Sequence, residues 1–229
     1  MNQDERKQAA ADYALRFIQS GMILGLGSGS TAERLLHAIA AATAAGQLHG
    51  IIGVPTSERT AHVATSLGIA LATPDAQPAV DLAIDGADEI DPDLNLIKGL
   101  GGALLREKIV AGSAAQFMVI GDESKLVAQL GERSPVPVEV SAFGVAPTAR
   151  QLVALGGEPL LRRTADGAAL MTDEGHMILD TRFGPIADVR ALAARLAALP
   201  GVMAHGIFAG MASRVVVAGS AGVRVLERP

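Results

Sequence analysis

Three short segments of the chain combine residue types that could bind a phosphate and move a proton. They are Gly25-Leu-Gly-Ser-Gly-Ser-Thr31, Asp85-Gly-Ala-Asp-Glu-Ile-Asp91 and Lys98-Gly-Leu-Gly-Gly-Ala-Leu-Leu-Arg-Glu-Lys108. Carboxylates can act as general bases, a lysine can stabilise a developing oxyanion, and glycine-rich turns expose backbone N–H groups. Together the segments indicate an enzyme that moves protons on a small phosphorylated molecule.

The glycine-rich segment lies between an apolar stretch at 22–26 and an amphipathic stretch at 32–43, so the pattern predicts a strand, a tight turn and a helix. The first N–H groups of a helix and its dipole favour an anion, and Ser28, Ser30 and Thr31 add hydroxyl donors. A dinucleotide fingerprint would need Gly at position 30, and a Walker loop would need a lysine. A phosphate monoester is the favoured ligand; a capped turn without a ligand is the alternative.

Asp85 and Asp88 follow an apolar stretch at 80–84, which is typical of a buried strand. Open α/β sheets bind ligands at the carboxyl ends of their strands, so both carboxylates are candidate site residues. A Mg²⁺ site is one alternative, and a purely structural turn is another, more so for Asp88. Asp91 and Asp93 are expected to face solvent in a turn.

Lys98 precedes a second glycine-rich turn, which leads into a helix predicted at 103–115. A lysine there could stabilise an oxyanion that develops on a carbonyl oxygen. Glu107 lies inside the predicted helix between two basic residues. From the spacing alone, an exposed and ion-paired glutamate is the simplest interpretation of Glu107.

The composition limits the class of protein. The chain has 229 residues, 49% of them hydrophobic and 19% charged, which predicts a folded protein with an ample core. A net charge of -5 leaves no basic stripe for nucleic acid, and the absence of cysteine excludes disulfides and thiolate chemistry. The first twenty residues lack the apolar run of a signal peptide, and no apolar stretch of about 18 residues could span a membrane. We therefore expect no membrane partner and a cytoplasmic location.

Alternating strand and helix patterns predict an α/β fold. In the first half, short apolar stretches that alternate with helical patterns predict a parallel sheet covered on both faces; the stretches are 22–26, 51–54, 69–72, 80–84 and 117–120. Beyond residue 130 the order becomes β-α-β-β-α-β, with one strand expected at 202–208. We predict a Rossmann-like parallel-sheet domain formed by 1–132 and 207–229, and a smaller α+β ferredoxin-like domain formed by 133–206.

The three segments, in this order and spacing, resemble ribose-5-phosphate isomerase of the A type. The resemblance extends to Gln3-Asp4-Glu5 with Lys7, Asp122-Glu-Ser-Lys125, Pro137-Val-Glu-Val140 and Leu155-Gly-Gly157, and so covers nearly the whole chain. It implies interconversion of D-ribose 5-phosphate and D-ribulose 5-phosphate through a cis-enediol, in the non-oxidative pentose phosphate pathway. It also implies that no metal or organic cofactor is needed, and that the partners are the sugar phosphate and further copies of the chain, usually in a homodimer and sometimes in a tetramer.

The resemblance also assigns roles to residues of this sequence. Glu107 matches the general base that moves the proton between C1 and C2, and Lys98 matches the residue that stabilises the enediolate. Asp85 and Asp88 match the carboxylates that handle the sugar hydroxyls and ring opening. The positions that match substrate and phosphate contacts are Lys7, Ser28, Gly29, Ser30, Thr31, Gly86, Ala87, Gly99, Leu100, Gly101 and Lys125. Two positions depart from the family pattern, since Ser28 stands where threonine is frequent and Leu100 interrupts the glycine run.

Two other functions stay open at the level of sequence. One is a non-catalytic sugar-phosphate sensor, although such a chain would normally carry a DNA-binding module, and none is readable. The other is a Mg²⁺-dependent phosphotransferase or phosphatase that uses Asp85 and Asp88, which loss of activity in EDTA would favour.

Overall fold

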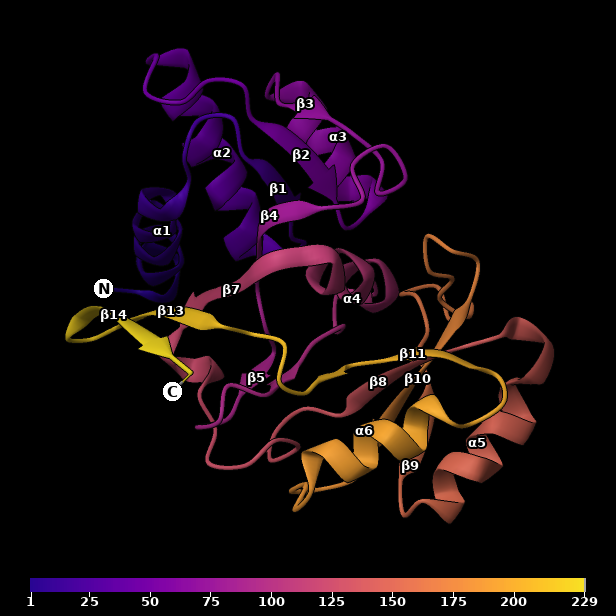
Figure 1. The fold of residues 1–229 in the computed structure, drawn as a ribbon. Coiled ribbons are helices and arrows are strands. Elements are labelled where there is room, and N and C mark those ends of the chain that lie inside the picture. Colours follow the sequence, from indigo (N-terminus) through magenta and orange to yellow (C-terminus); the bar gives the residue numbers. More distant parts are fainter. Residues whose placement is uncertain (229) are drawn as a thin grey trace. The chain divides into compact units, whose positions relative to one another are not determined.

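The computed structural model describes residues 1–228, which form two compact units (Figure 1). The first unit comprises residues 1–87, 106–125 and 211–228, and the second comprises 88–105 and 126–210. Residues 88–105, 126–132 and 207–210, which the sequence pattern assigned to the first domain, thus belong to the second unit.

The first unit is built on a seven-stranded sheet with the order β14-β13-β7-β4-β1-β2-β3. All neighbours are parallel except β14, which pairs with β13 in an antiparallel hairpin. The strands are β1 (Ile23–Leu26), β2 (Ile52–Pro55), β3 (Ala70–Leu71), β4 (Val80–Asp85), β7 (Ala114–Asp122), β13 (Arg214–Gly219) and β14 (Gly222–Glu227). The predicted parallel sheet, including the return of the last strands to it, is confirmed.

The helices of this part are α1 (Gln3–Ala14), α2 (Ser30–Ala44), α3 (Glu58–Ser66) and α4 (Leu104–Ser113). A capping box starts α1, since the Glu5 N–H donates to the Asn2 side chain at 2.9 Å and the Asn2 N–H donates to the Glu5 carboxylate at 2.8 Å. Ser57 caps α3 by accepting a hydrogen bond from the Thr60 N–H. Among residues 1–228, no helix is long and apolar enough to cross a membrane.

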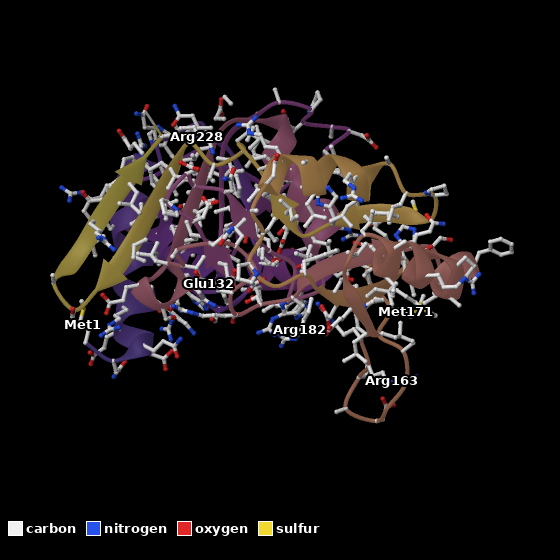
Figure 2. The ribbon with its side chains drawn as sticks, turned by 90° about the horizontal axis from the view of Figure 1, so that it is seen from below. Met1, Glu132, Arg163, Met171, Arg182 and Arg228 are labelled. Atoms are coloured by element: carbon white, nitrogen blue, oxygen red, sulfur yellow. The ribbon has the colours of Figure 1, made fainter. Side chains whose placement is uncertain are left out.

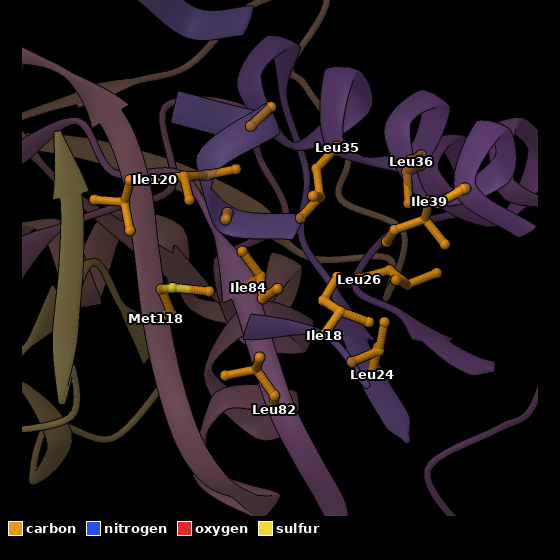
Figure 3. Close-up of a cluster of buried hydrophobic side chains, with 14 of the residues drawn as sticks. Ile18, Leu24, Leu26, Leu35, Leu36, Ile39, Leu82, Ile84, Met118 and Ile120 are labelled. Atoms are coloured by element: carbon orange, nitrogen blue, oxygen red, sulfur yellow. The ribbon is translucent and has the colours of Figure 1, made fainter. Parts of the chain in front are cut away.

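One face of the sheet carries the main hydrophobic core (Figure 3). Alternate residues of each strand point to this face, and full burial of each Leu or Ile contributes about 2 kcal/mol. The core side chains include Leu24, Leu26, Leu35, Leu36, Ile39, Leu82, Ile84, Met118 and Ile120. The intervening strand residues Gly25 and Ala83 face the other side, where Val110 of α4 packs so closely that a Cβ at Gly25 would lie 2.6 Å from the Val110 Cγ1 atom.

The second unit contains a four-stranded antiparallel sheet with the order β11-β8-β10-β9. Its strands are β8 (Val136–Val140), β9 (Glu158–Leu161), β10 (Met177–Arg182) and β11 (Val202–His205), and its helices are α5 (Val145–Ala154) and α6 (Val189–Ala197). The chain order β8-α5-β9-β10-α6-β11 is the β-α-β-β-α-β order that the sequence predicts.

A small three-stranded sheet with the order β12-β6-β5 completes the second unit. It joins β5 (Glu89–Ile90), β6 (Leu96–Ile97) and β12 (Ile207–Phe208). The prediction of a single strand at 202–208 is wrong, because β11 ends before Gly206 and the residues after Gly206 form β12 in this different sheet. A Cβ at Gly206 would lie 2.2 Å from the Lys98 carbonyl oxygen, so the close crossing of the two segments requires glycine.

Candidate active site

In the first unit, parallel pairing brings the loops after β1, β2 and β4 to one edge of the sheet. Leu26, the last residue of β1, lies opposite Pro55 of β2 and Ile84 of β4. From β1 the chain moves outward to β2 and β3, and it then returns to place β4 on the other side of β1. Open α/β sheets bind ligands at such a reversal of strand order, so this edge is the expected ligand side.

The backbone after β1 holds the carboxylate of Asp85. The Ser28 N–H donates to Asp85 Oδ1 at 3.0 Å, and the Gly86 N–H donates to the same oxygen at 2.7 Å. Asp85 is 3% exposed, and a Cβ on Gly27 would lie 2.4 Å from its Cγ atom. The glycine at position 27 therefore lets the loop approach the carboxylate closely, and the two N–H donors fix its orientation.

The Ser28 hydroxyl belongs to a cluster of hydroxyl groups that the sequence analysis missed. Its Oγ atom lies 2.8 Å from Thr56 Oγ1, 3.0 Å from Ser57 Oγ and 3.3 Å from Thr60 Oγ1. Thr60 also donates to the Gly27 carbonyl at 3.1 Å, which ties the start of α3 to the loop. The signal available in the sequence was the position of Thr56 directly after a strand next to β1 in a parallel sheet.

The N-terminus of α2 follows directly on the same loop and could accept an anion. Gly29 is the N-cap residue, with φ at +91°, a conformation that favours glycine. Because glycine has no side chain to cap the helix, the first-turn N–H groups are open to an external acceptor. Ser30 is exposed and Thr31 is half-buried in this turn, so their hydroxyls can add to the site. The phosphate loop stays a prediction, and this geometry is compatible with it.

Glu107 is buried, with 5% of its surface exposed, which contradicts the exposed glutamate that the spacing favours. On α4, Glu107, Val110 and Ala111 follow the i, i+3, i+4 spacing of a single helix face. Since Val110 packs against the sheet, Glu107 points to the sheet as well. Asp85 and Glu107 border the same narrow internal space of the first unit, which is too small for a water molecule, together with Gly27 and Thr56. Tertiary packing thus places two carboxylates together.

The start of α1 meets the segment after β7, where Lys7 and Lys125 lie half-buried. The Arg6 guanidinium pairs with the Glu123 carboxylate at 2.8 Å, which links the two segments. Burial alone would raise the pKa of Asp122. Hydrogen bonds from the Ser124 side chain and backbone, with Lys125 and Gln3 nearby, outweigh that effect and hold the pKa below its ordinary value. Asp122 is therefore a stable anion beside Lys125.

In the second unit, Asp88 and Lys98 lie on neighbouring segments. The Asp88 N–H donates to the Ile97 carbonyl at 2.8 Å, and its Oδ2 atom accepts a hydrogen bond from the Leu100 N–H at 3.0 Å. Lys98 is 3% exposed, and its Nζ atom lies 5.6 Å from the centre of the Phe208 ring. This aromatic face offers the ammonium group a favourable electrostatic contact where little water is present.

The remaining acidic residues of the second segment have structural roles. Glu89 is 1% exposed and accepts hydrogen bonds from the N–H groups of Gly131, Arg133 and Ser134. Asp91, which was expected to face solvent, is instead buried. Hydrogen bonds from the Asn95 backbone at 2.8 Å and the Asn95 side chain at 2.9 Å replace the water that its carboxylate loses. Within residues 1–228, no three or more histidine or carboxylate side chains form a group that could hold a metal ion.

Three features define the class of protein to which the chain belongs. They are a parallel sheet, a helix N-terminus that could accept an anion, and buried carboxylates where the strand order reverses. It is an α/β protein of the kind that binds a small phosphorylated ligand at the carboxyl edge of its sheet. The family model described as Ribose 5-phosphate isomerase A (phosphoriboisomerase A) matches residues 52–222. The chain therefore belongs to the ribose 5-phosphate isomerase A family.

Individual relatives agree with this assignment. The chain is 59% identical over its whole length to the ribose-5-phosphate isomerase A of Roseiflexus sp. (strain RS-1), of which it covers 98%. It is 55% identical to the protein of that name from Synechococcus sp. (strain JA-3-3Ab), with 98% of each chain covered. A solved D-ribose-5-phosphate isomerase in complex with phospho-erythronic acid is 40% identical, with a TM-score of 0.97 and full coverage of both chains. The isomerase from Plasmodium falciparum is 38% identical, with a TM-score of 0.94 and 98% of each chain covered.

Proposed function

We propose that the protein interconverts D-ribose 5-phosphate and D-ribulose 5-phosphate, a step of the non-oxidative pentose phosphate pathway, and that Glu107, Asp85, Asp88 and Lys98 carry the reaction. Membership of the ribose 5-phosphate isomerase A family supports the reaction. The observation that supports the choice of residues is that Asp85 and Glu107 border the same narrow internal space, in the unit whose β1 loop leads into the N-terminus of α2.

Glu107 is the proposed general base. In the direction of ribulose 5-phosphate, its carboxylate takes the proton from C2 of the open-chain aldose, and the electrons of that bond form the C1–C2 double bond of a cis-enediolate. The same carboxyl group then returns the proton to C1, while the O2 hydroxyl proton is transferred to O1 by way of the Asp85 or Asp88 carboxylate, so that C2 becomes the carbonyl carbon and O1 the hydroxyl. One carboxylate suffices for both transfers because the two carbons are adjacent. Burial of Glu107 limits exchange of that proton with water.

Asp85, Asp88 and Lys98 are proposed to handle the oxygen atoms. The two N–H donors on Asp85 Oδ1 hold its carboxylate in one orientation, as a group that transfers protons between sugar hydroxyls must be held. Asp88 is held likewise by the Leu100 N–H. The Lys98 ammonium, buried over an aromatic ring, stabilises the negative charge that develops on the enediolate.

The substrate and phosphate contacts are proposed from the loop geometry and the family resemblance. The N-terminus of α2 supplies the helix dipole and N–H groups, which suit a phosphate monoester. Binding energy at the phosphate orients the reacting carbons at the other end of the molecule. The proposed contacts are Lys7, Ser28, Gly29, Ser30, Thr31, Gly86, Ala87, Gly99, Leu100, Gly101 and Lys125.

The deciding experiment measures conversion of ribose 5-phosphate to ribulose 5-phosphate in excess EDTA for the wild type and Glu107→Gln. The amide is nearly isosteric but cannot accept the proton, so kcat is expected to fall by at least ~10²-fold. Glu227→Gln, an exposed glutamate paired with Arg214, is the control and should keep the wild-type rate. Near-normal turnover by Glu107→Gln would remove Glu107 from this role, and activity that EDTA abolishes and Mg²⁺ restores would indicate a metal-dependent enzyme.

The phosphate contacts are tested separately with Lys7→Ala and Lys125→Ala. Both variants should mainly raise KM, because the lysines are proposed to contact the phosphate and not the reacting carbons. A loss confined to kcat would contradict the proposal. Inorganic phosphate should inhibit the wild type competitively and the two variants less strongly.

We also propose, on the family resemblance, that the protein acts in the cytoplasm as a homodimer. Light scattering on the purified protein distinguishes a monomer of 23.4 kDa from a dimer or tetramer. A monomer at concentrations that support full activity would overturn the dimer.

A further inference from the structure

Hydrogen bonds from several segments hold the glycine-rich turn 98–102 of the second unit. The Lys98 N–H donates to the Gly206 carbonyl at 2.9 Å, and the Gly102 N–H donates to the Gly99 carbonyl at 3.0 Å. Gly99 and Gly102 have φ angles of +103° and +90°. Glycines have little steric resistance to rotation of their peptide planes, so such a turn keeps one conformation only when other groups hold it.

Arg162, the residue after β9, holds this turn from outside. Its Nη1 atom donates to the carbonyl oxygens of Gly99 and Leu100, both at 3.0 Å. The opposite edge of the guanidinium forms two hydrogen bonds with the carboxylate of Asp180 in β10. Nε donates to Oδ2 at 2.8 Å, and Nη2 donates to Oδ1 at 2.5 Å. The side chains of Arg162 and Asp180 are only 11% and 21% exposed. A bidentate pair of this kind fixes the guanidinium plane, and the remaining N–H groups then have fixed directions.

The geometry of the peptide group transmits this restraint to Asp88. The Gly99 carbonyl and the Leu100 N–H belong to one planar trans peptide group, in which C=O and N–H point in opposite directions. When Arg162 holds the Gly99 oxygen, the Leu100 N–H is directed away from Arg162, and it donates to Asp88 Oδ2 at 3.0 Å. In the same way, the contact to the Leu100 oxygen orients the N–H of Gly101.

We propose that Arg162 is a positioning residue for the isomerisation: held by Asp180, it fixes the peptide planes of Gly99 and Leu100 and so orients the carboxylate of Asp88. The inference rests on the proposed catalytic role of Asp88. Arg162 itself touches only Asp180 oxygens and backbone carbonyls in these contacts, so it acts through the turn. Lysine could not replace it, because one ammonium group cannot hold two carboxylate oxygens and two carbonyls with a planar fork.

The test compares Arg162→Lys with Arg163→Lys. Arg163 is the exposed neighbour in the loop between β9 and β10 (Figure 2), and its Nη1 atom donates to the Gly167 carbonyl of that loop. Arg162→Lys should lower kcat by about 10- to 100-fold, the effect of misplacing a reacting group by about 1 Å, with a KM change below about threefold. Asp180→Asn, which keeps the shape but weakens the grip on Arg162, should lower kcat in the same direction. Arg163→Lys should match the wild type.

Two further measurements separate positioning from mere stability. In ¹⁵N-labelled protein, Arg162→Lys should shift the Leu100 amide resonance and speed its hydrogen exchange, while Arg163→Lys should leave both unchanged. In the Asp88→Asn background, Arg162→Lys should reduce kcat by less than about twofold further, since the two changes act on one pathway.

The proposal is overturned if Arg162→Lys keeps kcat within about twofold of wild type. It is also overturned if the loss of kcat is the same in both backgrounds, or if the melting temperature falls while kcat per folded molecule is unchanged. If Asp88→Asn alone retains wild-type kcat, the proposed role of Asp88 fails, and the route through Asp88 fails with it. If Asp88→Asn is impaired but Arg162→Lys is not, only the positioning role is lost.

Discussion

Replacement of Gly27 by alanine tests whether close approach of the β1 loop to Asp85 is required for activity. The added Cβ would lie 2.4 Å from both the Cγ and Oδ1 atoms of Asp85 and 2.5 Å from its Cα. Ordinary contact between such atoms begins about 1 Å farther out, so either the loop or strand β4 must move by about that distance. Because one of the contacts is to backbone, rotation of the Asp85 side chain cannot relieve all of the overlap.

The expected consequences of Gly27→Ala follow from that displacement. Overpacking of this size costs about 1–3 kcal/mol, which corresponds to a melting temperature lower by roughly 2–12 °C in a chain of this length. Because Asp85 is proposed to transfer protons in the reaction, a shift of about 1 Å at its carboxylate should lower kcat by about 10²-fold. The assays are calorimetry and isomerase kinetics on the same preparation.

Gly112→Ala is the matched control for Gly27→Ala. Gly112 lies in α4, and a Cβ there would meet no atom within 4 Å. Gly112 is the penultimate residue of α4, so alanine there should stabilise the protein by at most about 0.5–1 kcal/mol and leave kcat unchanged. If Gly27→Ala retained wild-type kcat and stability, the close approach of Gly27 to Asp85 would not constrain the site, and the reasoning would be refuted.

Three further predictions concern stability. Burial lowers the pKa of Lys108 from 10.5 to about 8, so the unfolded state binds more protons than the folded state between these two pH values. The unfolding free energy of the wild type, measured relative to Lys108→Met by denaturant titration, should therefore rise as the pH increases from about 8 to 10.5. The pKa of Asp122 is lowered in the folded state, so its carboxylate stabilises the fold at neutral pH. Asp122→Asn should therefore lower the unfolding free energy most near pH 7, and this effect should fade as the pH falls below about 4. If the difference in unfolding free energy between the wild type and Asp122→Asn did not change with pH, the lowered pKa of Asp122 would be contradicted. Thr56→Val removes the hydroxyl that contacts Ser28 and the Leu26 carbonyl, and urea titration should show a loss of about 1 kcal/mol.

Local patterns were enough to identify the fold class and to predict a phosphate loop. The strand predicted at 22–26 and the helix predicted at 32–43 flank a segment of glycines and hydroxyl residues. Because the N–H groups at a helix N-terminus favour an anion, this order predicts an anion site without any knowledge of distant residues. Asp85 was predicted as a site residue in the same way, from its place at the end of an apolar strand. These inferences depend on interactions between residues close in sequence, which is why they could be made without the structure.

The parts of the site that join distant segments needed the tertiary structure. Glu107 has the local sequence of an exposed residue, and only the packing of α4 over Gly25 and Ala83 buries it beside Asp85. A helical spacing that puts Glu107 on the face of Val110 was visible, but not which face the sheet would cover. The hydroxyl cluster around Ser28 likewise depends on the parallel register of β1 and β2.

The clearest division between sequence and structure lies in the acidic segment 85–91 and the turn that follows it. The sequence by itself determined that carboxylates gather there, and which strand delivers them. The tertiary structure decided that Glu89 is held by three backbone N–H groups, while Asp88 is oriented by a turn that Arg162 holds from 62 residues farther along the chain. The physical reason is that the role of a carboxylate depends on its donors, and these donors come from segments that only folding brings together.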